Sequence, residues 1–339
     1  MSQSASVDLL SLSDVDAASA EVEAAVDATP EIDPWCSGPD WALPVHLGFA
    51  PRADRLLVRV AGPAGPSFAL LARYHTEDGR RAIAGLDPLW GFASPVVGAE
   101  TGLVAAEVAD LLRHDPDWDL IWLTGMPVPT GPDSFLPHLI RHLGSLGRVA
   151  VAPGISSRLA DLGHGHDAWL ARRSQRFRRN LRQAERRADS AGLTVHDAAG
   201  DPHPFQRILA IERRSWKGRE LGGITTPEMA ATYRAMVERL AAAGRLRLLV
   251  ARLDGADVGY VLGGVRGRTY RGLQISYHTS VAPLSVGHLL QHHQIKRLVE
   301  GDEADVYDLG MDMPYKARWA DTTRTSHTLV IERGPDGLA

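Results

Sequence analysis

The segment that begins at Arg268 decides the fold, because three short stretches with different patterns follow one another there. These are RTYRGLQISYH at residues 268–278, APLSVGHLL at residues 282–290 and ADVYDLG at residues 304–310. The first stretch is rich in β-branched and aromatic residues and predicts a strand. Pro283 breaks that strand, and Ser285 is placed to cap a helix that begins near Val286. The third stretch predicts a second strand, so we expect a β-turn-α-β unit.

A parallel β-turn-α-β unit aims the N-terminus of its helix at the edge of the sheet. The first N–H groups of a helix have no partner within the helix, and the helix dipole adds a partial positive charge there. Such a place binds pyrophosphate well. The sequence therefore predicts a phosphate site formed by the backbone N–H groups of Gly287, His288, Leu289 and Leu290, where Gly287 permits close approach.

This turn and its continuation resemble the cofactor-binding half of a GNAT acyltransferase, in particular the CelD-type (cellulose-biosynthesis-like) acetyltransferase group. In that group the turn reads S-P-G-x-L-L, and the strand after the helix ends in an acidic residue followed by Y-K-x-R-W. This chain has SVGHLL at residues 285–290, Asp308 in the strand, and YKARW at residues 315–319. Val286 replaces the proline of the group, and the broader signature Q/R-x-x-G-x-G/A is absent. Binding of acetyl-CoA therefore follows from the subgroup alone.

The resemblance implies an acyl-CoA, most often acetyl-CoA, as the donor substrate, with no metal. It implies that Asp308 orients the amine or acts as the base, and that Tyr315 protonates the departing thiolate. Donor-binding residues are then expected at Gln274, Ile275, Ser285, Val286, Gly287, His288, Leu289 and Leu290. Acceptor-binding residues are expected at Trp216, Lys217, Tyr277, Lys316 and Arg318, since the WKG and YKARW stretches both match the group.

The rest of the second half supports the same fold. Its pattern predicts a strand near residues 193–196, helices at 204–216 and 227–243, and strands at 247–253 and 258–265. The second helix is capped either by a box of Thr225 and Glu228 or by Thr226 before Pro227, and Asp254-Gly255 predicts a hairpin turn. With the quoted unit, the order is β-α-α-β-β-β-α-β-β, which is the GNAT order.

Residues 55–157 also alternate strands and short helices but contain no glycine-rich nucleotide loop. We expect an α/β fold with a mixed sheet and two GNAT-like domains in tandem, the N-terminal one degenerate, an arrangement similar to FemABX peptidyltransferases. The expected division is an acidic, mobile leader at residues 1–33, a degenerate domain at 34–157 and a catalytic domain at 158–335. A linker at residues 153–167 would separate the two domains.

The charge of the chain is uneven. The first 51 residues carry nine acidic residues and no Lys or Arg, so a net charge of −4 leaves the remainder at about +5 (−4 plus 9). This balance suits an anionic ligand such as a CoA nucleotide and is far below that of a nucleic-acid-binding protein. A single cysteine excludes an intrachain disulfide. With no apolar stretch of membrane length and no signal-peptide pattern, we expect a soluble cytoplasmic protein.

The most basic stretch, Arg172–Arg187, holds eight Arg in sixteen residues. Phe177, Leu181, Ala184 and Ala188 recur at helical spacing, so one face should pack and the other should be solvated. This helix either covers the edge of the sheet or provides an electrostatic surface for an anionic acceptor or for tRNA.

Glu212 is the first candidate for the catalytic base. In the predicted helix at 204–216 it lies in an otherwise apolar stripe with Phe205, Leu209 and Trp216, and burial would raise the pKa of its carboxyl. An ion pair with Arg213 or Arg318 is the alternative role. His288 and His292 have a zinc-like i, i+4 spacing, but no H-E-x-x-H is present, and we expect no metal.

The leading hypothesis is an acyl-CoA-dependent N-acyltransferase acting on a primary amine of a small or saccharide-like acceptor. The alternatives are a FemABX-like aminoacyl transferase that takes its donor from tRNA, and a binding module without catalysis. Apart from tRNA under the first alternative, no nucleic acid or membrane partner is expected.

Overall fold

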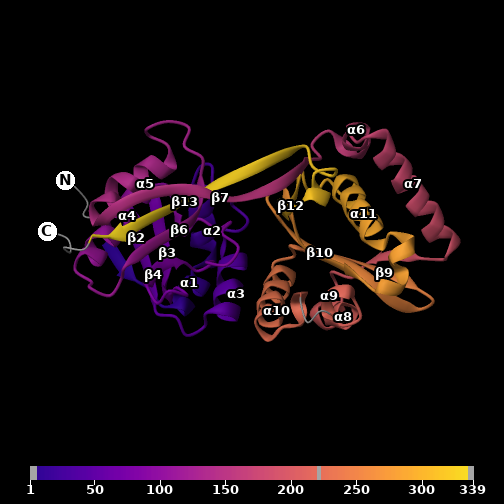
Figure 1. Cartoon of the computed structure of the whole chain (residues 1–339), viewed down its shortest axis with the longest axis horizontal. Coiled ribbons are helices and arrows are strands. Elements are labelled where there is room, and N and C mark those ends of the chain that lie inside the picture. Colours follow the sequence, from indigo (N-terminus) through magenta and orange to yellow (C-terminus); the bar gives the residue numbers. More distant parts are fainter. Residues whose placement is uncertain (1–5, 220–222, 335–339) are drawn as a thin grey trace. The chain divides into compact units, whose positions relative to one another are not determined.

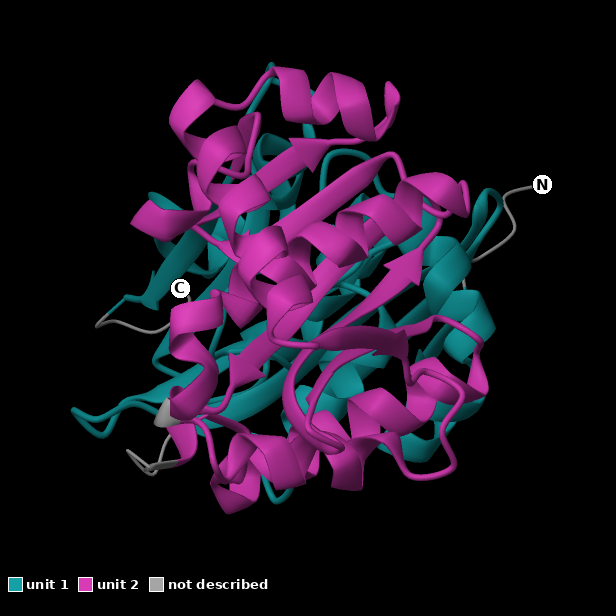
Figure 2. Cartoon of the chain, turned by 90° about the vertical axis from the view of Figure 1, so that its right-hand side faces the viewer, with its two compact units in different colours: residues 1–155, 325–339 teal, residues 156–324 magenta. Residues whose placement is uncertain are grey.

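The structure is a computed structural model, and it describes residues 6–219 and 223–334 (Figure 1). The chain divides into two compact units, coloured in Figure 2. Unit 1 contains residues 1–155 and 325–339, and unit 2 contains residues 156–324. The chain passes from one unit to the other within two strands, β7 (Gly147–Asp161) and β13 (Thr322–Arg333).

Unit 1 is built on a mixed sheet with the strand order β1-β2-β3-β4-β6-β13. Besides β13, the strands of unit 1 are β1 (Ser6–Leu9), β2 (Arg55–Gly62), β3 (Gly65–His75), β4 (Arg81–Gly85), β5 (Val96–Val97) and β6 (Leu120–Pro127). Its helices are α1 (Leu12–Ala17), α2 (Ser19–Asp27), α3 (Pro39–Phe49), α4 (Thr101–Arg113) and α5 (Phe135–Leu143), followed by the short 3₁₀ helix η1 (Gly144–Leu146). β4 and β6 run parallel and are joined through α4.

The start of the chain differs from the expected mobile leader. A capping box at Ser11 begins α1, and Val15, Val22 and Val26 on α1 and α2 are fully or almost fully buried in the core of unit 1. The three valines form an apolar stripe among Ala, Ser, Asp and Glu, and burying that stripe holds the segment against the sheet. Acidic composition alone therefore did not distinguish a docked segment from a mobile one.

The expected domain boundaries also differ from the structure. The segment expected as a linker forms most of the second half of β7 and the start of α6 (Gly165–Ala171). Residues 326–332, expected in the catalytic domain, pair with β6 in unit 1 through β13. Strand exchange of this kind depends on long-range pairing, which local sequence patterns do not encode.

Unit 2 has the strand order β7-β12-β11-β10-β9-β8. The strands are β8 (Thr194–Asp197), β9 (Leu246–Leu253), β10 (Ala256–Arg266), β11 (Thr269–Tyr277) and β12 (Val306–Met311). The helices are α6, α7 (Gln175–Ser190), α8 (Pro204–Glu212), α9 (Trp216–Arg219), α10 (Pro227–Ala242) and α11 (Val286–Glu300), with 3₁₀ turns η2 (Gly223–Thr225), η3 (Thr279–Leu284) and η4 (Pro314–Lys316). α6, α7 and α11 lie on one face of the strands and α8, α9 and α10 on the other (Figure 1).

The order of elements in unit 2 confirms the predicted β-α-α-β-β-β-α-β-β pattern. The Thr226 hydroxyl caps α10 by accepting from the N–H of Met229. Asp254 and Gly255 both have positive φ and join β9 to β10 as an antiparallel hairpin. On α7 the predicted apolar face also forms, because Leu181, Ala184 and Ala188 are buried. In no helix of the described residues is there a span long and apolar enough to cross a membrane.

The pairing of β11 with β12 is short, and this shapes the site. Thr269–Arg271 pairs in parallel with Val306–Asp308, whereas β11 continues to Tyr277 with β10 as its antiparallel partner. A bulge at Leu262/Gly263 of β10 changes the register at the same level of the sheet. Beyond Arg271 the two parallel strands therefore separate, and the edge of β11 is available to other groups.

Replacing Val22 by Asp tests whether α2 is part of the core of unit 1. An unpaired carboxylate at a site with 0% exposure should lower the free energy of unfolding by about 3 kcal/mol or more. Ala24→Asp, at an exposed position of the same helix, is the matched control and should change it little. Denaturant unfolding followed by circular dichroism measures both, and equal effects would mean that α2 is not docked.

Candidate active site

The start of α11 has an unusual backbone. Ser285 is in the left-handed region (φ 60°, ψ 37°), and its carbonyl accepts hydrogen bonds from the N–H groups of His288 and Leu289. Its side chain caps nothing, and its hydroxyl instead accepts from Arg187 Nη2 at 3.2 Å. The expected side-chain cap is therefore wrong, and two of the expected phosphate donors are engaged. Among the described residues no acceptor contacts the N–H groups of Val286 and Gly287.

Gly287 lets the helix lie close to β11. A Cβ at this position would be 2.9 Å from Tyr277 Cε1, so any larger residue would push α11 away from the strand. Ile275 lies beneath the same position, with its Cδ1 4.0 Å from that Cβ site. Val286, Leu289 and Leu290 are buried in the core and fix the first turn of the helix. The structure thus brings the predicted donor-binding residues of β11 and α11 together.

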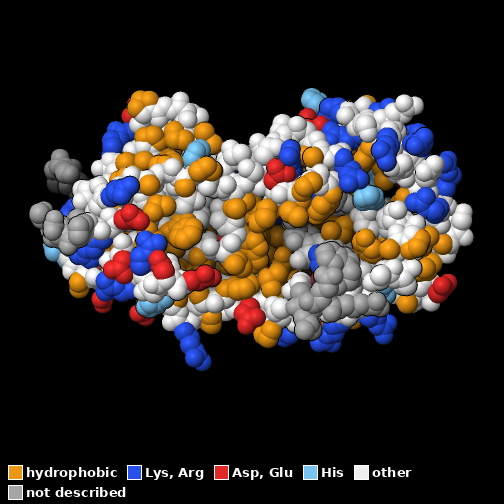
Figure 3. Space-filling view, viewed as in Figure 1, with side chains coloured by type: hydrophobic (Ala, Val, Ile, Leu, Met, Phe, Trp, Pro, Cys, Tyr) orange, Lys and Arg blue, Asp and Glu red, His pale blue; other side chains and the backbone are white. Residues whose placement is uncertain are grey.

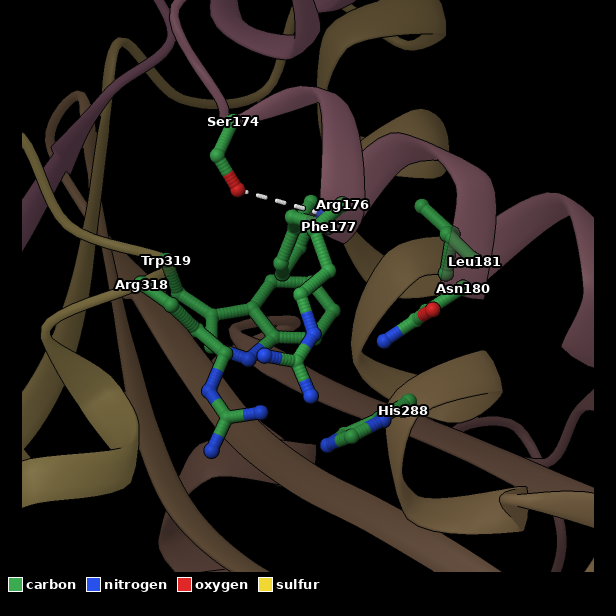
Figure 4. Close-up of a pocket in the computed structure, with 8 residues that line it drawn as sticks. All are labelled: Ser174, Arg176, Phe177, Asn180, Leu181, His288, Arg318 and Trp319. Carbon is green, nitrogen blue, oxygen red and sulfur yellow. Dashed lines mark hydrogen bonds between the residues drawn. The ribbon is translucent and has the colours of Figure 1, made fainter.

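A cavity of about 390 Å³ adjoins this first turn. It is lined by α7, by His288 of α11 and by the chain after η4, through Ser174, Arg176, Phe177, Asn180, Leu181, His288, Arg318 and Trp319. Arg176, Asn180, His288 and Arg318 point toward one another across it (Figure 4). Among the described residues that line it, none is acidic, and the nearby Arg318 adds to desolvation in lowering the pKa of His288. The cavity is suited to an anion.

Stacked aromatic rings hold the wall of this cavity. Trp319 is almost fully buried and stacks on Trp169 with ring centroids 5.9 Å apart, while Phe177 meets it edge-on at 4.9 Å. Arg173 pairs with Asp321 and donates to the carbonyl of Ala320 at 2.7 Å. The segment that carries Arg318 is therefore fixed against α6 and α7.

Glu212 lies on the opposite face of the sheet and has 0% exposure. Its Oε2 accepts from the Tyr260 hydroxyl at 3.1 Å and from the Ser215 hydroxyl at 3.5 Å. Its Oε1 has no hydrogen-bond partner among the described residues, and a Cβ at Gly223 would lie 2.3 Å from it. The described contacts of Glu212 are thus hydroxyl groups, and no ion pair of the described residues joins it to Arg213 or Arg318.

Lys217 extends from α9 to the edge of β11 that β12 leaves open. Its Nζ donates to Gln274 Oε1 and, at 3.0 Å, to the carbonyl of Ile275. Burial lowers the pKa of Lys217, and the charge of Glu212 opposes that shift. Tyr233 of α10 donates to the neighbouring carbonyl of Leu273 at 3.3 Å. The side chain of Trp216, the other predicted residue of this stretch, lies outside what the structure describes.

Asp308 is buried and joined to two guanidinium groups. Its Oδ2 accepts from Arg271 at 2.6 Å and from Arg324 at 2.8 Å, and its Oδ1 accepts from the N–H of Gly310 at 2.7 Å. With both oxygens engaged and 1% exposure, Asp308 is built to hold β11, β12 and β13 in place. Its geometry favours a positioning role over that of a free base.

The YKARW segment follows β12 and forms η4. Tyr315 is 44% exposed, and desolvation raises the pKa of its hydroxyl. Lys316 Nζ donates to the carbonyl of Met311 at 2.9 Å, while Arg318 Nε donates to the carbonyl of Tyr315 at 3.1 Å. Burial, followed by the charge of Arg271, lowers the pKa of Lys316 to about 8. Tyr315 and Lys316 are thus near the opening between the strands, and Arg318 faces the cavity.

Four residues of this region were not singled out from the sequence, namely Arg176, Asn180, Arg271 and Tyr260. Arg176 and Asn180 share one face of α7 four residues apart, which a helical wheel of the basic stretch could have shown. Arg271 and Tyr260 are polar residues inside apolar strands, which is itself a signal of a buried polar partner. The partners Asp308 and Glu212 become visible only when the strands are placed side by side.

His292 is buried beside α6 and α7. Its Nε2 lies 2.8 Å from Nε2 of His166, and its Nδ1 lies 3.1 Å from Glu185 Oε1. His166 is therefore partly buried, with 17% of its side chain exposed. Across the described ranges 6–219 and 223–334, no group of three potential metal ligands is found.

Unit 1 repeats the β-α-β arrangement with β4, α4 and β6, but the start of its helix is covered. Thr101 and Gly102 in the first turn of α4 are buried, and a Cβ at Gly102 would lie 2.2 Å from Nε2 of His138 on α5. The corresponding turn of α11 instead ends at the exposed His288 beside a cavity. The helix start in unit 1 therefore leaves no room for a phosphate group.

Comparison with known proteins agrees with this geometry. Residues 175–317 match the family model described as an acetyltransferase (GNAT) domain. No curated protein matches the chain by sequence. Residues 175–317 are therefore similar to a GNAT acetyltransferase domain, while the finer resemblance to the CelD-type group stays a prediction.

Solved structures show that the fold extends over both units. The chain is similar to FemX (12% identity, TM-score 0.64, 95% of this chain and 96% of that chain covered). It is similar to a tandem GNAT protein from the clavulanic acid biosynthesis pathway (16%, 0.52, 98% and 99%). It is also similar to L-PGS from Bacillus licheniformis (13%, 0.55, 94% and 92%). The tandem GNAT fold predicted from the sequence is confirmed.

The lowered pKa of Lys316 can be measured directly, because the chain contains only three lysines, Lys217, Lys296 and Lys316. A neutral amine reacts with acylating reagents, whereas an ammonium does not, so labelling of Lys316 should reach half its maximal rate near pH 8. Peptide mass spectrometry across pH 6–11 (about the range of amine titration) gives the curve, with Lys296 as internal reference. A midpoint at the ordinary value of 10.5 would contradict the burial of Nζ.

Proposed function

We propose that unit 2 transfers an acyl group, most often acetyl, from an acyl-CoA to a primary amine of a small-molecule or saccharide-like acceptor. The observation that carries the proposal is the separation of β11 from β12 beside the open first turn of α11 and its cationic cavity. In this proposal the donor phosphates bind at Val286, Gly287 and the cavity, and the thioester lies between the strands.

The donor end of the site is supported by charge and by backbone geometry. Arg176 and Arg318 present guanidinium groups to the cavity, and guanidinium is well matched to phosphate oxygens. The N–H groups of Val286 and Gly287 point from the positive end of a 15-residue helix. Both features favour a ligand with a phosphate group over an uncharged one.

The acceptor end is supported by the polar residues on the opposite face. In the proposed reaction the amine nitrogen attacks the thioester carbonyl, a C–N bond forms, and the C–S bond breaks. Glu212 receives the proton of the amine through an intervening water, since its carboxylate is fully buried. Tyr315 gives a proton to the departing thiolate, and Asp308 keeps Arg271 and the strand ends in place.

Glu212→Gln tests the proposed base. The substitution keeps the shape and the hydrogen bond from Tyr260 but removes the proton acceptor, so kcat should fall about 10²–10⁴-fold. Acyl-CoA binding, measured by thermal shift, should remain, because Glu212 lies on the face opposite α11. Release of free CoA thiol with a panel of amines measures the rate.

Two results would count against this assignment. A Glu212→Gln variant with full activity would move the base elsewhere, and absence of any thermal shift with a panel of acyl-CoAs would reject the donor class. Asp308→Asn is the companion variant, and it should lower stability together with activity, because Arg271 loses its charged partner while 2% exposed.

Transfer of an aminoacyl group from tRNA is the second candidate. The fold likeness to FemX and the exposed arginines Arg176 and Arg179 on α7 favour it. Under this alternative the protein should bind tRNA at about 200 mM salt and show no CoA binding, with Arg176→Ala and Arg179→Ala each weakening the complex. Binding lost with a steep salt dependence would mark the contact as non-specific.

A further inference from the structure

A second cavity adjoins the η3 turn that precedes α11, and its lining is also cationic. It has a volume of about 510 Å³ and is formed by the C-terminal half of α7 and by η3, through Gln183, Arg186, Arg187, Ser190, Ala191, Pro283 and Leu284. As in the first cavity, the described residues that line it include no carboxylate. Arg and Lys side chains gather over this part of unit 2 in Figure 3.

Residues on one face of α7 line both cavities. Arg176 and Asn180 line the first, and Gln183 and Arg187 line the second, at spacings of four, three and four residues. These spacings place the four side chains in one stripe along the helix. The Ser285 turn lies beside the C-terminal end of this stripe, where its hydroxyl accepts from Arg187.

Two of the arginines that line the cavities have no other contact in the described structure. Arg176 and Arg186 are exposed and make no hydrogen bond or ion pair with a described residue. They are ten residues apart, about 15 Å along an α-helix. Exposed guanidinium groups beside a cavity without carboxylates keep their full capacity to bind anions.

We propose that the second cavity binds a further phosphate group of the donor, apart from its diphosphate, so that the site selects a 3′-phosphorylated nucleotide donor. The inference rests on the proposed acyl-CoA function. In the proposed complex the first cavity and the start of α11 bind the diphosphate, and the ribose of the adenosine lies against the Ser285 turn. Arg186 and Arg187 then bind the phosphate on the ribose.

The proposed binding mode agrees with the geometry of the Ser285 turn. The left-handed Ser285 joins η3 to α11, and one cavity is lined by His288 of α11 whereas the other is lined by Pro283 and Leu284 of η3. A donor with one phosphate cluster would use only the first cavity. A donor whose ribose carries the diphosphate at its 5′ carbon and a phosphate at its 3′ carbon uses both, and each charge-assisted contact adds affinity.

Dephospho-CoA lacks only the ribose phosphate and is therefore the matched probe. Isothermal titration of the full chain at fixed ionic strength should show that CoA binds about tenfold more tightly than dephospho-CoA. In Arg186→Ala the preference should fall to about twofold or less, through weaker CoA binding and unchanged dephospho-CoA binding. Arg182→Ala is the control, since Arg182 is an exposed arginine of α7 that lines neither cavity, and it should keep the preference.

The outcomes separate this inference from the function on which it rests. Equal affinity of the wild-type protein for CoA and dephospho-CoA would overturn the second phosphate site and leave the acyl-CoA function standing. Failure of both to bind would overturn both. Loss of the preference in Arg182→Ala as much as in Arg186→Ala would also overturn the site, because it would show a general effect of helix charge. Thermal unfolding of each variant verifies that the surface substitution leaves the fold intact.

Discussion

The separation of two parallel strands is the constraint on which the site depends. β11 and β12 share three residue pairs, and beyond Arg271 each follows a different partner. A strand edge inside a protein must find hydrogen-bond partners, and here Lys217 and Tyr233 supply part of them. The same separation lies between the face that carries α11 and the face that carries Glu212.

The two faces of the sheet differ in charge near the place where β11 and β12 separate. On the α11 face the described groups are the helix start, His288 and arginines, so the local potential is positive. Away from that face, Asp308 is paired with Arg271 and Arg324, whereas Glu212 is bonded to hydroxyl groups. A buried pair fixes geometry at a cost in desolvation, which is a common property of positioning networks. The division suits a reaction in which an anionic donor and an amine meet from opposite sides.

The two units show that the helix start of a β-α-β arrangement can lie beside a cavity or be covered by a side chain. In unit 2 Gly287 lets α11 approach Tyr277 while the helix start stays beside a cavity. In unit 1 Gly102 plays the opposite part, because it lets His138 of α5 cover the start of α4. A glycine in the first turn is thus no sign of a phosphate site by itself. Whether the helix start has room for a phosphate group depends on the side chain that lies over it.

The sequence by itself determined the order of elements in unit 2, the glycine turn before α11, a threonine cap at the start of α10 and the hairpin at Asp254-Gly255. These features are local, since propensity, capping and turn chemistry act within a few residues. It also indicated Glu212 as a buried carboxylate, because helical spacing places it in an apolar stripe. The tertiary structure alone decided the docking of α2, the exchange of β13 into unit 1, the partners of Glu212 and Asp308, and the joining of α7 to the α11 turn. Each of these depends on contacts between residues far apart in the chain, whose pairing is set by packing and by the register of strands.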